Sequence, residues 1–146
     1  MTDLLLIKNL TDRQAITDLV SRLGLWLDEK RFDDASLFTD DVTVSTPGGS
    51  AQGVELVAAQ ARRNHDHDGL QHVITNVLID LDGDQARVRA NLIVTMVPDA
   101  AAPEAHVTMG ERYRFEAVRT GVGWRLSRIE VEPIWRSGTL ERTAAG

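Results

Sequence analysis

Cysteine is absent from the 146 residues, which excludes disulfides, thiolate chemistry and zinc sites built on cysteine. The chain also lacks any apolar run near the roughly 20 residues that span a bilayer, so we expect no membrane partner. No basic segment precedes the short apolar start of the chain, and we therefore expect no signal peptide. Together with the missing cysteine, this predicts a cytoplasmic protein.

The chain also has fewer basic than acidic residues. It contains 16 basic and 22 acidic residues, which gives a net charge of −6, and the basic residues are scattered along the sequence. A phosphate backbone would be repelled on average, so nucleic acid is not expected as a partner.

The length and composition predict one domain over residues 1–146. With 42% apolar residues, the chain can build a core. We expect that core to occupy about 10–138, and the small, polar stretch 139–146 to be a flexible tail.

The N-terminal half has helical patterning interrupted by one strand. Thr11 to Gln14 reads as a capping box, which predicts a helix beginning there and ending at Asp28. Apolar spacing predicts a short second helix over 32–38, and a third follows over 54–62. Between them, 42–46 reads as a strand that Pro47 and the following glycines end.

From residue 70 the hydrophobic period changes to two. Four long strands are predicted, over 70–81, 86–96, 107–118 and 124–135. The alternation slips inside the last strand, which predicts a β-bulge near Ser127 and Arg128. Helices ahead of an antiparallel meander indicate an α+β fold. Strands this long must coil, so we expect a cone-shaped, strongly curved mixed or antiparallel sheet with the N-terminal helices covering its concave face.

Three groups of residues in this order resemble the SnoaL-like domains of the nuclear transport factor 2-like superfamily. They are Leu27 to Val42, then His72 to Ala86 with a His-x-x-Thr-Asn strand, and finally Arg112 to Gly138. The resemblance implies a cone with a deep pocket for a hydrophobic small molecule, commonly in a homodimer formed through the sheet.

The resemblance also points to Asp28 and His72 as catalytic residues. In scytalone dehydratase-like and bile-acid dehydratase-like members, an aspartate at the end of the first helix faces a histidine from the sheet. A carboxylate bonded to one imidazole nitrogen would fix the tautomer, leaving the other nitrogen as a general base or acid. The alternative is that Asp28 caps local backbone and His72 is a satisfied core histidine.

Five residues are expected to contact the substrate: Trp26, Tyr113, Trp135, Thr46 and Asn76. The tryptophans could stack on a flat ligand, or they could belong to the core or the dimer interface. Tyr113 is the only tyrosine, and Leu27 and Thr46 stand where related dehydratases carry tyrosines, which weakens the case for dehydration itself.

Two related mechanisms fit the sequence less well. The ketosteroid isomerase positions correspond to Leu23, Thr46 and Glu111, of which only Glu111 keeps an acid. The paired aspartates of the epoxide hydrolase arrangement have no counterpart inside the long strands.

His65 and His67 suggest metal ligands, but no motif places a third, and we interpret them as part of a solvated loop. We therefore expect no metal and no cofactor. The prediction is an acid–base enzyme of dehydratase, isomerase or cyclase type acting on a hydrophobic, carbonyl-bearing molecule. The alternatives are a non-catalytic ligand-binding module and a dimeric scaffold.

Overall fold

The computed structural model describes residues 2–138. In that range two helices accompany one six-stranded sheet. The elements run in the order α1 (Asp3–Asp28), β1 (Phe38–Thr46), β2 (Gly49–Gln52), α2 (Val54–Asn64), β3 (Gly69–Asp82), β4 (Gln85–Val97), β5 (Val107–Thr120) and β6 (Gly123–Gly138). The predicted domain tail, 139–146, lies outside the described residues.

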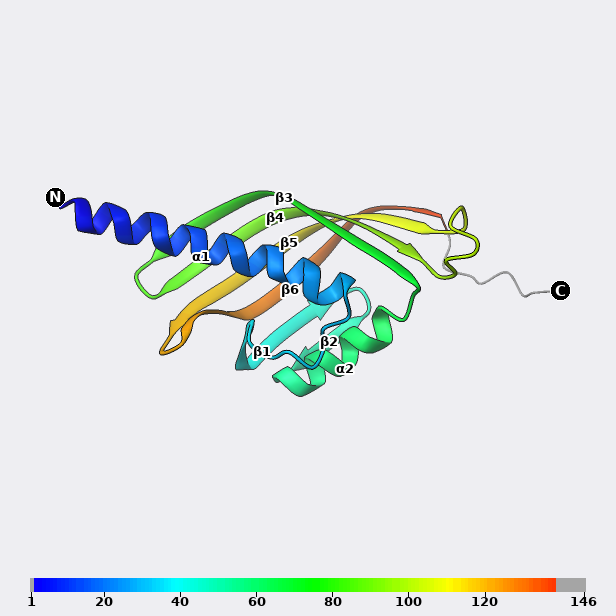
Figure 1. The fold of residues 1–146 in the computed structure, drawn as a ribbon, viewed down its shortest axis with the longest axis horizontal. Helices are drawn as coiled ribbons and strands as arrows, with labels where there is room; N and C mark the ends of the chain where they lie inside the picture. Colours follow the sequence, from blue (N-terminus) through cyan, green and yellow to red (C-terminus); the bar gives the residue numbers. More distant parts are fainter. Residues whose placement is uncertain (1, 139–146) are drawn as a thin grey trace.

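The sheet is mixed and open, with strand order β2-β1-β6-β5-β4-β3. Strands β3 to β6 form an antiparallel meander, and β1 joins β6 in parallel. Figure 1 shows α1 running across the sheet and α2 lying beside β1 and β2. The predicted α+β cone is thus confirmed.

Helix α1 begins eight residues before the predicted start. Thr11 lies inside the helix, where its hydroxyl donates to the Ile7 carbonyl at 2.8 Å, so it caps nothing. The preceding residues are mostly good helix formers without proline or glycine, and the helix continues through them. The N-terminal end of α1 extends past the β3–β4 turn (Figure 1), which leaves Leu4 to Ile7 exposed.

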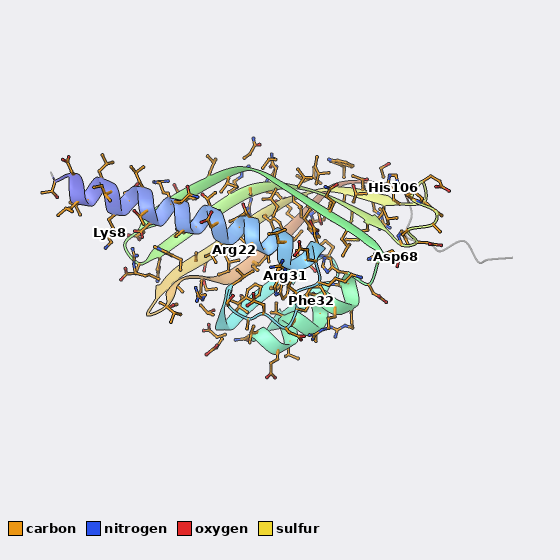
Figure 2. The ribbon with its side chains drawn as sticks, viewed as in Figure 1. Lys8, Arg22, Arg31, Phe32, Asp68 and His106 are labelled. Atoms are coloured by element: carbon orange, nitrogen blue, oxygen red, sulfur yellow. The ribbon has the colours of Figure 1, made fainter. Side chains whose placement is uncertain are left out.

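The predicted helix over 32–38 is absent, and this expectation was wrong. The Asp34 carboxylate accepts from the Ser36 backbone N–H at 2.9 Å, a local bond that competes with helix formation. Phe32 and Leu37 are nevertheless buried, and Phe32 lies beside the C-terminal end of α1 (Figure 2). The apolar spacing therefore identified residues of the core correctly, but these residues lie in turns and not in a helix.

Three bulges in the β3–β6 meander decide which side chains of β3 and β6 face inward. Ser127 has no partner on β5, which confirms the bulge predicted in β6. A second bulge in β6 falls at Ile134, and one in β3 falls at Asn76, whose φ is +56°. Because a bulge reverses the alternation of faces, each one moves the residues after it to the opposite face.

The core lies between the helices and the concave face of the sheet. It takes one face of α1, the inward residues of β4 and β5, and parts of β1, α2 and β6. At the far end of α1, Asp12 is buried and fixes the helix to the β5–β6 hairpin. Its carboxylate accepts two bonds from Arg119, at 2.9 and 2.7 Å, and one from the Trp124 indole at 3.1 Å. The guanidinium of Arg119 lowers the pKa of the Asp12 carboxyl.

Candidate active site

A pocket of about 540 Å³ lies between the C-terminal half of α1, α2 and the sheet. Its wall is largely apolar, with Leu23 and Leu27 from α1 and Leu92 and Val94 from β4 among its residues. Polar side chains, several of them titratable, interrupt this apolar wall, and an apolar pocket with convergent polar groups is the usual form of a small-molecule site.

The predicted pair of Asp28 and His72 meets at this pocket. Asp28 is the last residue of α1, and His72 lies near the start of β3. The Asp28 Oδ1 atom lies 2.6 Å from the His72 Nδ1 atom, and the His72 backbone N–H donates to both carboxylate oxygens at 3.0 Å. The carboxylate therefore holds both the ring and the main chain of His72.

This geometry fixes the tautomer of His72. An ionised carboxylate only accepts hydrogen bonds, so the proton of a neutral imidazole must sit on Nδ1. Nε2 then carries the lone pair, and the ring lines the pocket with only 3% of its side chain exposed. A base with a fixed orientation, shielded from water, is the arrangement that general base catalysis requires.

Tyr113, Trp26 and Thr46 also line the pocket. Tyr113 is buried on β5, and burial raises the pKa of its hydroxyl, so it remains a hydrogen-bond donor across the physiological range. The Trp26 indole donates to the Asp34 carbonyl at 2.8 Å and packs edge-on against Phe38, which makes it both core and pocket wall.

Trp135 and Asn76 do not line the pocket, which differs from the prediction. The bulge at Ile134 turns Trp135 to the outer face, where its ring covers Gly110. It brings Arg136 to the pocket instead. Asn76 is the bulged residue of β3 and is exposed.

The segment after α2 was interpreted as a solvated loop, yet both of its histidines line the pocket. Helix α2 continues to Asn64, so His65 caps its C-terminal end against the interior. Its Nδ1 atom lies 2.8 Å from the Ala61 carbonyl oxygen, and its ring centroid lies 5.5 Å from that of His72. Burial lowers the pKa of His65 to about 4, so this ring is neutral at physiological pH.

Glu111 is the residue that the sequence reasoning undervalued. It is 7% exposed and lines the pocket from β5, two residues from Tyr113. Burial raises the pKa of its carboxyl, and the charge of protonated His72 acts in the opposite direction. The sequence pattern does indicate Glu111, because it is the only acidic residue at the alternate positions that it shares with Met109, Tyr113 and Phe115, the face of the strand predicted to point inward.

Among residues 2–138, no group of three or more histidine, aspartate or glutamate side chains is placed to hold a metal ion. No helix in that range is long and apolar enough to cross a membrane.

Fold and pocket together define an open α+β cone of the nuclear transport factor 2-like type, in which His72 lines the pocket and is bonded to Asp28. The chain belongs to the SnoaL-like domain family, whose model matches residues 8–130. No sequence among the curated proteins matches it.

Three solved structures illustrate the likeness. A candidate aromatic ring hydroxylase from Novosphingobium aromaticivorans is 27% identical over 90% of this chain and 95% of its own, with a TM-score of 0.79. A candidate scytalone dehydratase from the same species is 22% identical over 92% and 91%, with a TM-score of 0.80. The hexachlorocyclohexane dehydrochlorinase LinA-type3 from Novosphingobium barchaimii is 18% identical over 93% and 95%, with a TM-score of 0.80.

Proposed function

We propose that this protein is an acid–base enzyme that removes a proton from a carbon next to a carbonyl group in a hydrophobic small molecule. The observation that carries the proposal is the bond between His72 Nδ1 and Asp28, because it leaves Nε2 as a base on the wall of an apolar pocket. The chemistry is that of a dehydratase, isomerase or cyclase and uses only groups of this chain.

In this proposal each group has one task. Nε2 of His72 takes the proton, and Asp28 stabilises the imidazolium that results. The Tyr113 hydroxyl, neutral because of burial, donates to the carbonyl oxygen as negative charge develops there. Trp26, Leu92 and Val94 hold the apolar part of the substrate.

The names of two structural neighbours support an elimination reaction. A dehydratase removes water and a dehydrochlorinase removes hydrogen chloride, and a general base can begin either elimination by removing a proton from carbon. A third neighbour carries a hydroxylase name, so the shared fold alone does not choose the reaction. The preference for acid–base chemistry rests on the site.

Proton abstraction can be tested without knowing the natural substrate. The probe is 4-phenylbutan-2-one in D₂O, a ketone with an aromatic end and no leaving group, with deuterium incorporation next to the carbonyl followed by NMR. We expect the wild type to accelerate exchange and His72→Ala to return it to the buffer rate. His106→Ala is the matched control, because His106 is exposed at the β4–β5 end of the sheet and does not line the pocket (Figure 2).

Two outcomes would contradict the proposal. Exchange that survives in His72→Ala would mean that another group is the base. Binding of the ketone without any exchange by the folded wild type would favour the non-catalytic binding module instead.

We also propose that two copies associate through the outer face of the sheet. Val73, Ile93, Gly110 and Trp135 are aligned across β3 to β6, and the three side chains in this outer row are each 46–47% exposed. Apolar side chains in a contiguous exposed row favour an interaction surface. Ile93→Glu should shift the mass measured by light scattering from dimer to monomer, whereas a monomeric wild type would contradict this proposal.

A further inference from the structure

We propose that Glu111 is a second catalytic residue, a proton donor that faces His72 across the pocket and delivers its proton to an oxygen leaving group. The inference rests on the proposed function and deepens it. It makes the substrate class β-hydroxy carbonyl compounds, and it makes the reaction a loss of water.

His72 and Glu111 lie on the same concave face of the sheet, on different strands. His72 lies on β3 and pairs with Val94 on β4, whereas Glu111 lies on β5 and pairs with Leu92 on β4. The two side chains are thus separated by one intervening strand, β4, and their partners on that strand, Val94 and Leu92, are two residues apart on the same concave face. A ligand seated on Leu92 and Val94 would lie between them, with the base at one end and the carboxyl at the other.

The surroundings of the Glu111 carboxyl group favour retention of its proton. Glu111 is 7% exposed, and none of the hydrogen bonds among residues 2–138 engages its carboxyl group. Burial removes part of the hydration of a carboxylate here, which shifts the balance toward the protonated form relative to a carboxyl group in water. Arg112, its neighbour on the strand, turns to the other face and contacts Glu132 there.

Proton transfer at His72 and Glu111 would leave the net charge of the pocket interior unchanged. The other titratable or charged groups on the pocket wall are Arg63, His65, His67, His72, Tyr113 and Arg136. Arg63 and Arg136 are exposed and therefore lie toward solvent. In the interior, neutral His72 and neutral Glu111 would become imidazolium and carboxylate together, and the charge of His72 favours ionised Glu111. The two charges appear as a pair, and the net charge of the pocket does not change.

Nε2 of His72 removes the proton next to the carbonyl, and that C–H electron pair forms the carbon–carbon double bond. The C–O bond at the next carbon breaks toward oxygen, which takes the Glu111 proton and leaves as water. Passage of one proton from His72 to Glu111 through water restores both groups, so the net reaction is substrate to unsaturated carbonyl plus water.

The choice of leaving group follows from this proton. Hydroxide is a poor leaving group whose departure is much faster when it receives a proton, whereas chloride departs as a stable anion and needs none. A pocket acid opposite the base is therefore useful for dehydration and dispensable for dehydrochlorination.

The experiment compares two probes with one carbon skeleton, 4-hydroxy-4-phenylbutan-2-one and its 4-chloro counterpart. Both give the same product, whose absorbance is followed. Glu111→Gln keeps the size of the side chain and removes the transferable proton, and it is expected to fold because a neutral amide needs no charge partner at this buried position. Glu116→Gln, on the exposed outer side of the same strand, is the matched control.

We expect Glu111→Gln to slow loss of water by about 10²–10⁴-fold and loss of chloride by less than tenfold. His72→Ala should lose both reactions, and Glu116→Gln should lose neither. In addition, the ¹³C carboxyl signal of Glu111 should titrate at higher pH than those of the exposed glutamates.

The results separate the two proposals. Equal losses of both reactions in Glu111→Gln, a wild type that eliminates chloride but not water, or a Glu111 signal that titrates with the exposed glutamates would overturn the donor role alone. A wild type that performs neither elimination and no deuterium exchange would overturn the proposed function, and the donor role with it. Deuterium exchange without either elimination would leave His72 as a base and would overturn the role of Glu111.

Discussion

Replacing Asp28 by asparagine should disable His72 by changing its tautomer. The Asp28 carboxylate now accepts from two donors, the Nδ1–H at 2.6 Å and the backbone N–H of His72 at 3.0 Å. An amide of the same shape has one acceptor oxygen, and its NH₂ group can only donate. The backbone N–H lies 3.0 Å from both carboxylate oxygens, so the NH₂ group faces it in either orientation, and with the amide oxygen in the Oδ2 position the NH₂ group faces Nδ1–H as well.

A shift of the imidazole proton from Nδ1 to Nε2 removes the contact between the NH₂ group and the Nδ1–H donor. When the NH₂ group turns toward Nδ1, the amide oxygen keeps the backbone N–H, and Nδ1 loses its proton in order to accept from the NH₂ group. The ring proton then sits on Nε2, which no longer has a lone pair for the substrate. General base catalysis contributes about 10²–10⁴-fold, so the barrier should rise by about 3–5 kcal/mol.

Stability should fall less than activity. The charge-assisted bonds from the ring and from the backbone N–H of His72 are replaced by neutral ones, which costs about 1–3 kcal/mol. Two measurements separate these effects, namely the deuterium exchange rate with 4-phenylbutan-2-one and the ¹⁵N shifts of the His72 ring, which report the protonated nitrogen directly. Asp18→Asn, exposed on the same helix, is the matched control.

The reasoning would be refuted if Asp28→Asn kept its proton on Nδ1, or if it exchanged deuterium as fast as Asp18→Asn. Either result would mean that Asp28 neither sets the tautomer nor supports the base. Loss of activity accompanied by general unfolding would assign Asp28 a structural role instead.

Three further variants test other parts of the structure. Burial lowers the pKa of His65 from 6.5 to about 4, so an unfolded chain binds a proton there between these pH values that the folded chain does not. Stability should therefore fall as pH drops through this window, by at most on the order of 3 kcal/mol, and His65→Gln should flatten the fall in denaturant titrations. Gly110→Ala would place a Cβ 2.0 Å from the Trp135 indole nitrogen, so the ring should swing into solvent, seen as a red shift in fluorescence; an unchanged spectrum would contradict this packing. Asp12→Asn should lower stability by about 1–3 kcal/mol in thermal unfolding because it weakens the bonds to Arg119 and Trp124, and no loss would contradict the anchoring role.

The regular parts of the fold could be read from hydrophobic periodicity. Strands β3 to β6 fall within a few residues of the predicted ranges, because each alternates over a dozen residues and is bounded by a turn. The short segment between α1 and β1 could not be read this way, since Phe32 and Leu37 reach the core from turns at helical spacing.

The side-chain directions after a bulge were harder to predict. Trp135 shares its parity with Ile129 and Val131, which predicts an inward ring, but the unpaired residue at Ile134 reverses the alternation. Nothing in the local sequence except Pro133 marks that position. Asn76 follows the same logic in β3, where its positive φ forms the bulge instead of presenting the side chain to the pocket.

The site itself was predicted unevenly. The meeting of Asp28 and His72 came from resemblance to a family, because 44 residues separate them and periodicity cannot join a helix end to a distant strand. Glu111 was visible to periodicity but was weighed only as part of another mechanism. The position of His65 on the pocket wall depends on where α2 ends, which is Asn64 and not residue 62, and helix ends are the least certain boundaries of a sequence-based prediction.

Helix α1 carries both the anchor of the fold and the support of the proposed base, at separate points. Asp12 and Asp28 lie 16 residues apart, which is about 24 Å along a helix. Asp12 is bonded to the β5–β6 hairpin, and Asp28 is bonded to the start of β3. Because they share no partner, substitutions at the two positions should act additively. Asp12→Asn should therefore lower the unfolding temperature while the His72 ring keeps its proton on Nδ1, and Asp28→Asn should move that proton in a chain that is still folded. Coupling between the two variants, measured as a change in the His72 ¹⁵N shifts when Asp12 alone is replaced, would mean that the helix transmits strain from the anchor to the pocket.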